Sequence, residues 1–154
     1  MEEQNRLVEI TFFAMIPSGL WVLAAGLWAA GRMGGLAPIA ALAGYEEMLP
    51  IGAAGLALAG LLGAAWLRSR LIESIAASGT MTAAEFLQRA RSAVTVYAAV
   101  AEAPGLIALT AYALLPAPWL LVSTAAYAAL AAALLRPEVA KWYDELRRRG
   151  QIRA

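Results

Sequence analysis

Residues 103–135 read APGLIALTAYALLPAPWLLVSTAAYAALAAALL, a run of 33 residues without a charged side chain. A helix crosses the hydrocarbon core of a bilayer, about 30 Å thick, with roughly 20 apolar residues. The apolar stretch starts upstream at Ser92, so it is too long for one crossing. Pro116-Ala117-Pro118 divides it, because proline has no N–H to donate and restricts the residue before it. The sequence predicts two membrane spans here, at about residues 92–115 and 119–135.

Two more apolar runs lie upstream. Residues 10–31 and 48–67 contain 22 and 20 residues, and neither run has a charged side chain. Backbone without internal hydrogen bonds cannot face lipid, and the alternating strands of a membrane barrel are missing from the sequence. We therefore expect an all-α fold, a four-transmembrane-helix bundle within residues 1–136. Residues 33–44 are too short to span, and we expect an external loop there with a short interfacial helix near residues 39–43.

The composition excludes several kinds of function. Hydrophobic residues make up 62% of the chain and charged residues 15%, against roughly 25% charged residues in soluble domains. Histidine and cysteine are absent, which excludes disulfides, zinc sites of Cys and His, and acid–base catalysis by His. A net charge of +1 offers no basic face for nucleic acid. We expect no metal site, no cofactor and no nucleic-acid partner.

Lysine and arginine are distributed unequally over the two sides of the expected bundle. Eleven of them lie on the side of both termini and of the connection between the second and third spans, and Arg32 alone lies on the other. Cytoplasmic loops carry the excess of these residues, so we expect both termini in the cytoplasm. Arginine outnumbers lysine 11 to 1, which resembles the coding bias of GC-rich bacteria and favours a bacterial inner membrane.

The connection between the second and third spans has helix signals of its own. Gly79 is suited to end one helix, and Thr82 with Glu85 forms the pattern of a capping box at the start of the next. The two helices are therefore expected to form an extended hairpin that projects into the cytoplasm. Its charged tip is interpreted either as a solvated surface or as a docking surface for a soluble partner.

A tail of residues 137–154 is expected to follow the fourth span, with a helix that begins at Pro137. Four apolar residues recur in it at helical spacing on one face: Val139, Trp142, Tyr143 and Leu146. The pattern is typical of an interfacial amphipathic helix whose aromatic side chains lie at the level of the lipid headgroups. The alternative is a helix that binds a partner or senses lipid.

Small residues recur at four-residue or similar spacing and predict where helices approach closely, since membrane helices associate through small residues. The expected packing residues are Gly55, Ala59 and Gly63 in the second span and Ala98, Ala101 and Gly105 in the third. They are interpreted as contacts within the bundle. Contacts in a homo-oligomer or with other membrane subunits are the alternative.

Glu102 is the one charged residue inside an expected span. It lies 11 residues beyond Arg91, about 16 Å along a helix and so near the middle of the bilayer. No span offers it a cation, so we expect the carboxyl to be protonated at neutral pH. Pro104 leaves the carbonyl of Val100 without its helical donor, and Thr95 lies about two turns away. Intramembrane carboxyls are candidate functional sites.

Three roles are open for Glu102. It can be a hydrogen-bonding node that fixes helix packing, a group that binds and releases a proton or a cation, or a partner for a basic group of another subunit.

Residues 51–115 resemble the hairpin of the proteolipid ring subunits of rotary ATPases. The resemblance rests on the small-residue run from Gly52-Ala-Ala-Gly55 to Gly63, the polar connection from Arg68 to Arg91, and the segment Ala101-Glu102-Ala103-Pro104-Gly105. It implies that Glu102 is the carboxyl that carries the ion. The alternating Gly-x-Gly run and the Arg-Gln-Pro turn of that family are absent here.

The sequence thus favours a non-enzymatic membrane subunit or scaffold of a larger complex. A proton- or cation-translocating carrier or ring subunit is the second hypothesis. An enzyme is disfavoured, because Glu46 and Glu47 are the only adjacent carboxyls near the outer membrane surface. A channel is disfavoured because no span has a polar face.

The expected topology is testable because the chain contains no cysteine. Single cysteines at Gln4 and Arg153 should react with an impermeant maleimide only after the cells are permeabilised. A cysteine at Met33 should react in intact cells. Labelling of the two chain ends from opposite sides would contradict four crossings.

Overall fold

The structure is a computed structural model that describes residues 2–36, 44 and 48–153, with the side chains of residues 2–6 left aside. The expected interfacial helix near residues 39–43 and the pair Glu46–Glu47 lie outside the described residues.

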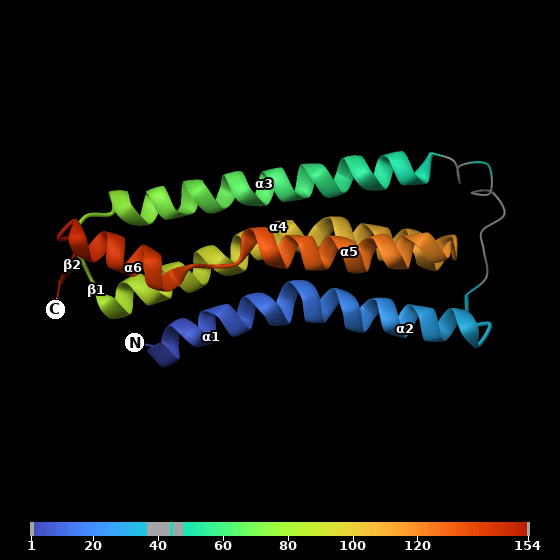
Figure 1. The fold of residues 1–154 in the computed structure, drawn as a ribbon, viewed down its shortest axis with the longest axis horizontal. Coiled ribbons are helices and arrows are strands. Elements are labelled where there is room, and N and C mark those ends of the chain that lie inside the picture. Colours follow the sequence, from blue (N-terminus) through green and yellow to red (C-terminus); the bar gives the residue numbers. More distant parts are fainter. Residues whose placement is uncertain (1, 37–43, 45–47, 154) are drawn as a thin grey trace.

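Four long apolar helical segments lie side by side along the molecule (Figure 1). Each is long and apolar enough to cross a membrane, which confirms the predicted number of spans and a multipass membrane protein. The N- and C-termini lie at the same end of the molecule as the turn between α3 and α4. The helices are α1 (Glu2–Phe13), a π-helical segment η1 (Ala14–Gly19), α2 (Leu20–Arg32), α3 (Leu49–Ala77), α4 (Ala83–Leu114), α5 (Pro118–Leu135) and α6 (Val139–Arg148).

The helices α3 and α4 are longer than a membrane span. Their 29 and 32 residues correspond to about 43 and 48 Å of helix. Gly79 follows the end of α3 with φ +80°, a conformation that glycine adopts without strain. At the start of α4 the Thr82 N–H donates to Glu85 Oε2 at 2.8 Å, and the Glu85 N–H donates to Thr82 Oγ1. The predicted helix end and capping box are both confirmed.

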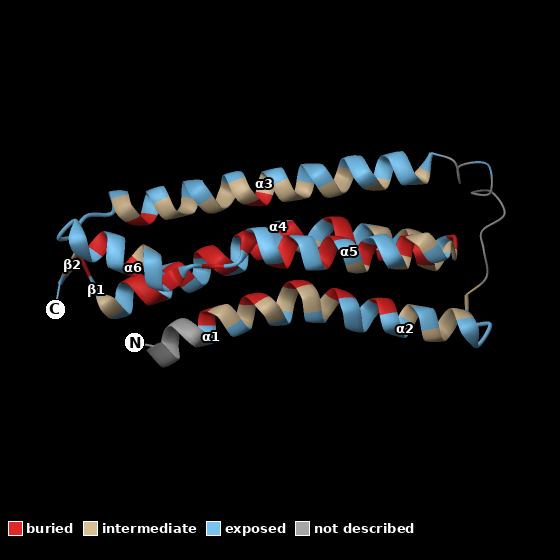
Figure 2. Ribbon diagram, viewed as in Figure 1, coloured by how far each residue is buried: buried red, intermediate tan, exposed pale blue. Residues whose placement is uncertain are grey.

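The buried residues concentrate on α4 and α5 and on the edge of α1, η1 and α2 that faces them (Figure 2). α4 is central, because it contacts α1, η1, α2, α3 and α5. Phe12 and Tyr97 are fully buried where α1 meets α4, with ring centroids 5.9 Å apart. By contrast α3 buries only Ala64 and Ile75 and leaves the rest of its surface partly or fully exposed. An exposed apolar surface of this extent is what a helix in contact with lipid requires.

The contact of α3 with α4 does not use the row of small residues expected on α3. A Cβ at Gly60 would lie 2.2 Å from Pro104 Cγ, whereas a Cβ at Gly55 would meet nothing within 4 Å. Ala59 is exposed, and a Cβ at Gly63 would only just reach Val100 at 4.0 Å. An Ala- and Gly-rich helix carries several parallel rows of small residues, and the ring of Pro104 selects the row of Gly60. On α4 the expected residues Ala98, Ala101 and Gly105 are all buried.

The apolar face of the tail helix packs on the protein, and its expected place at a membrane surface stays a prediction. Val139, Tyr143 and Leu146 are buried, and the Tyr143 ring meets the Phe86 ring of α4 at 5.5 Å. Trp142 remains partly exposed. The helix begins at Val139, two residues after the predicted start. A helix with one apolar face can bury it in lipid or against protein, and here the first turn of α4, which extends past the other spans, offers the apolar partner.

A short parallel pair of strands joins the end of the tail to the turn of the hairpin. β1 (Met81–Thr82) pairs with β2 (Ile152–Arg153). The Met81 N–H donates to the Gln151 carbonyl at 2.8 Å, and Gln151 Nε2 donates to the Ala76 carbonyl near the end of α3, also at 2.8 Å. Strands of two residues are too short to be recognised from the sequence. They tie the tail to both helices of the hairpin.

The contact of Gly60 with Pro104 generates a prediction. In Gly60→Ala the new methyl group meets a ring that cannot rotate away, so stability should fall by about 1–3 kcal/mol. Gly105→Ala meets the flexible side chain of Leu20 at 2.6 Å, so we expect a smaller loss. Gly55→Ala has open space and should be neutral or slightly stabilising. Thermal unfolding in detergent measures all three, and equal stability of Gly60→Ala and Gly55→Ala would contradict the assigned contact.

Candidate functional site

One turn of α4, residues 101–105, contacts the other three spans. The Ala101 carbonyl accepts a hydrogen bond from Tyr127 of α5 at 2.5 Å. Pro104 lies against Gly60 of α3, and Gly105 lies against Leu20 of α2. Glu102 of the same turn reaches η1, as described below. In a bilayer, where the hydrophobic effect does not drive helices together, such close contacts hold a bundle in one arrangement. We refer to these five residues as the 101–105 turn.

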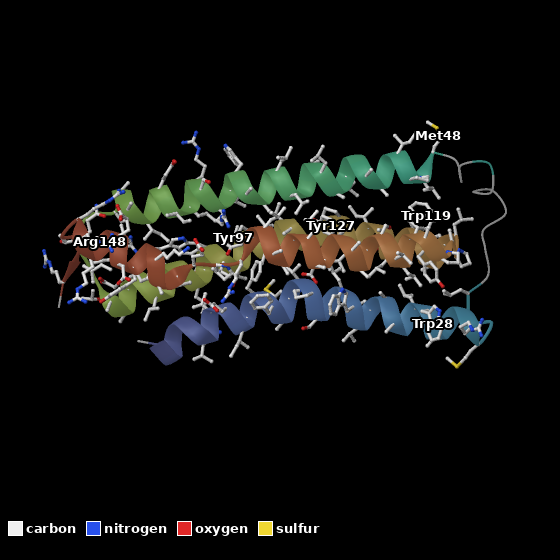
Figure 3. The ribbon with its side chains drawn as sticks, viewed as in Figure 1. Trp28, Met48, Tyr97, Trp119, Tyr127 and Arg148 are labelled. Carbon is white, nitrogen blue, oxygen red and sulfur yellow. The ribbon has the colours of Figure 1, made fainter. Side chains whose placement is uncertain are left out.

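Glu102 lies over a glycine of the first span. A Cβ added to Gly19 would be 3.2 Å from Glu102 Oε1, so the carboxyl occupies the space that a side chain at position 19 would need. Glu102 is half-buried, in the angle between α4 and the first span. Figure 3 shows Tyr127, whose hydroxyl reaches the neighbouring Ala101, between Tyr97 and Trp119 along the long axis of the molecule. Glu102, next to Ala101, therefore lies between the levels of Tyr97 and Trp119 along the molecule, and its depth in a bilayer stays a prediction.

The segment that carries Gly19 is a widened turn. η1 spans Ala14–Gly19 and contains Pro17. Proline removes one helical hydrogen bond and its ring clashes with the carbonyl four residues earlier, which favours a wider turn. The Leu20 N–H, just after the segment, reaches the carbonyls of both Ile16 and Pro17. Single π-helical turns are frequent at functional sites, and this one faces the carboxyl of Glu102.

Within the described residues, Glu102 has no hydrogen bond or ion pair to another side chain or to the backbone. The described part of the chain also contains no group of three acidic side chains that could hold a metal ion. The neighbours of the carboxyl are the glycine and the alanine-rich backbone around it. A half-buried carboxyl in such surroundings can exchange a proton, or it can hydrogen-bond a group from outside the chain.

Of the residues expected near Glu102, Pro104 and Val100 lie close to it on the same helix, and Thr95 does not contribute to the site. Pro104 is in the same turn but faces α3. The Thr95 hydroxyl donates to the Arg91 carbonyl of its own helix at 3.0 Å and is exposed. In the sequence, Pro104 leaves the Val100 carbonyl without its helical donor. The structure instead places the Tyr127 hydroxyl on Ala101, one residue further along.

Sequence reasoning missed three residues of this site: Gly19, Pro17 and Tyr127. Pro17-Ser18-Gly19 in the middle of an apolar span was a usable signal for an irregular turn. Nothing in the sequence indicated Tyr127, because its hydrogen bond joins residues 26 positions apart. Its role follows from the close approach of α5 to the Ala101 carbonyl.

The charged side chains that flank the site lie at the end of the molecule that holds both termini. Arg136 pairs with Glu9 at 3.2 Å and so ties the end of α5 to α1. Arg68 of α3 donates to the Leu134 carbonyl at 3.2 Å. At the other end, Arg32 lies over the Trp28 ring at 6.0 Å, and Trp119 begins α5 (Figure 3). Arginine and tryptophan are typical of membrane–water interfaces, so Glu102 lies between two such levels.

Substitutions at Gly19 and Gly26 test whether the carboxyl of Glu102 contacts Gly19. Gly19→Ala should displace Glu102 by a few tenths of an ångström, whereas Gly26→Ala meets nothing within 4 Å. We expect Gly19→Ala to change the rate at which a lipid-soluble carbodiimide modifies Glu102, measured by mass spectrometry, and Gly26→Ala to leave it unchanged. The same rate in both variants would show that Gly19 does not contact the carboxyl.

Comparison with known proteins finds no family model, no curated protein and no solved structure that matches this chain. The resemblance of residues 51–115 to ring-subunit hairpins, and the ion-carrying role that it implies for Glu102, stay predictions.

Proposed function

We propose that this chain is a non-enzymatic integral membrane subunit of a larger assembly, and that Glu102 forms the polar contact with its neighbour. One observation carries the proposal. Glu102, which we expect near the middle of the bilayer, is half-buried, its Oε1 lies 3.2 Å from the position of a Cβ at Gly19, and none of the described residues hydrogen-bonds to it. A polar group left unpaired away from water destabilises a protein by about 1–3 kcal/mol, and a charged group by more. A hydrogen bond from a neighbouring subunit removes that penalty.

In this proposal the carboxyl of Glu102 is protonated at rest. An isolated carboxylate in hydrocarbon is strongly unfavourable unless a cation accompanies it. The neutral carboxyl both donates and accepts a hydrogen bond, so it can pair with a carbonyl, a hydroxyl or an amide of a partner. The excess of arginine at the end with the α3–α4 turn supports an orientation with that end and both termini in the cytoplasm of a bacterium.

The hairpin supports the idea of a subunit in a second way. α3 and α4 are about 43 and 48 Å long, which exceeds the hydrocarbon core by more than 10 Å. In the proposed orientation this excess stands in the cytoplasm, with Arg70, Glu73, Glu85, Arg89 and Arg91 exposed on it. A soluble partner can reach these side chains.

A carrier that moves protons or cations through Glu102 is the second candidate. The observation that favours it is the irregular backbone on both sides of the carboxyl, η1 with Pro17 on the first span and Pro104 on α4. Prolines and π-helical turns let a membrane helix bend where it carries a site. A carrier also needs a second polar pathway, which a partner subunit has to supply.

Substitutions at Glu102 separate the two candidates. Glu102→Gln keeps the size and the hydrogen bonds of a neutral carboxyl, so the subunit proposal expects the assembly to survive mild detergent extraction. Glu102→Leu removes the hydrogen bonds and should release the neighbours, as seen by native electrophoresis and mass spectrometry. Thr110→Val removes an exposed hydroxyl of the same helix that donates to the Leu106 carbonyl of its own backbone, so it is the control and should change nothing.

The outcome that contradicts the subunit proposal is an unchanged assembly in Glu102→Leu. The carrier is tested by proton uptake into vesicles that contain the intact assembly. Uptake that is lost in Glu102→Gln and retained in Glu102→Asp supports the carrier, because only a group that titrates can release a proton. Equal uptake by the wild-type protein and Glu102→Gln excludes it.

A further inference from the structure

A wedge-shaped space separates one half of α3 from α4 and α5. The helices α3 and α4 are in close contact at Gly60 and Pro104. From there towards the start of α3 two cavities, of about 590 and 260 Å³, lie between α3 and the other two helices and share Ala53 and Ala108 in their walls. A Cβ at Gly52, in the wall of the larger cavity, would meet nothing within 4 Å. We refer to the two cavities together as the α3 wedge.

The length of the α3 wedge matches one leaflet of a bilayer. It extends along α3 from Met48 and Leu49 to Ala57, just before the contact at Gly60. Leu49 and Gly60 are 11 positions apart, which corresponds to about 16 Å of helix, and half of the hydrocarbon core is about 15 Å. Met48 and Trp119, which each line one of the two cavities, lie at the same end of the molecule in Figure 3, and tryptophan is typical of membrane–water interfaces.

The walls are mostly apolar and suit hydrocarbon, with the indole of Trp119 in the wall of the smaller cavity. The larger cavity is lined by aliphatic side chains and backbone alone. The smaller cavity has three hydroxyl groups, and each of them already donates to a backbone carbonyl within the bundle, Ser123 and Thr124 to Leu120 and Tyr127 to Ala101. A phosphate or carbonyl inside the wedge would find no free hydroxyl hydrogen. The headgroup of an occupant must therefore stay outside.

The volume of the larger cavity is sufficient for a lipid acyl chain and too small for a helix. Carbon atoms in contact lie about 3.5–4.0 Å apart, so 16 Å of an extended acyl chain occupies roughly 300 Å³. A helix is about 10 Å across with its side chains, and 16 Å of it occupies roughly 1,200 Å³. Only the acyl chain is smaller than the larger cavity of about 590 Å³.

We propose that the α3 wedge is a binding site for one phospholipid acyl chain, taken from the leaflet at the Met48 end. The chain enters beside Met48 and Trp119, and its methyl end lies against the contact of Gly60 with Pro104. Its headgroup remains at the surface. The site depends on the spacing of α3 from α4 and α5, and it is independent of the role proposed for Glu102.

A matched pair of variants on α3 tests the site. Ala53→Phe fills the wedge from a position that lines both cavities, and Ala59→Phe adds the same ring on the exposed face. The purified protein is incubated with dioleoyl phosphatidylglycerol in detergent, and bound lipid is counted by native mass spectrometry. We expect Ala59→Phe to retain one lipid per chain and Ala53→Phe to bind it at least about tenfold more weakly, since displacing only two buried methylene groups has that effect.

A second measurement avoids filling the core. A bimane probe on Ala57→Cys, in the wall of the smaller cavity, should be quenched by one molar equivalent of a phospholipid with brominated acyl chains in detergent. The same probe on Ala59→Cys should not be quenched. Equal lipid retention in the two phenylalanine variants, or equal quenching at the two positions, overturns the proposal. Loss of a second protein chain in Ala53→Phe, with the lipid retained, would show that a helix fills the wedge.

Discussion

The close contact of the Pro104 ring with Gly60 determines how the remainder of the bundle is arranged. It fixes the point at which α3 touches α4, and it leaves α3 apart from α4 and α5 towards Met48. The residues beside Pro104 hold the other spans, since Ala101 accepts the hydrogen bond from Tyr127 and Gly105 admits the side chain of Leu20. One turn of a central helix thus sets the positions of three neighbours, in a medium where only close packing and hydrogen bonds can do so.

The same turn explains why a carboxyl is tolerated within an apolar span. Glu102 lies between Ala101 and Pro104, so packing on both sides fixes its backbone. The missing side chain of Gly19 gives the carboxyl its space. The widened turn around Pro17 brings that glycine opposite α4. A rigid turn on one helix and an irregular turn on the other therefore hold the acid at the edge of the bundle, half-buried and accessible to a neighbouring subunit.

Local features could be predicted from the sequence, and contacts between distant segments could not. The four apolar segments, the end of α3 before Gly79 and the capping box of Thr82 and Glu85 each depend on a few adjacent residues, and all are confirmed. The choice between the Gly55 and Gly60 rows was not decidable, because both rows are small. The apolar face of α6 was correctly recognised, but amphipathicity alone does not say whether lipid or Phe86 covers it. Whether Glu102 acts as proposed stays a prediction.

The pairing of β1 with β2 has a consequence for biosynthesis. Met81 and Ile152 are 71 positions apart, and α4, α5 and α6 lie between them. The ribosome makes α3 and α4 before α5 and α6. At that stage β1, at the tip of the α3–α4 hairpin, has no partner strand, and Tyr143 does not yet cover Phe86. Closing so long a loop is slow compared with forming a helix. The tip is thus the last part of the molecule to mature, and a nascent chain exposes Phe86 to chaperones and proteases until then.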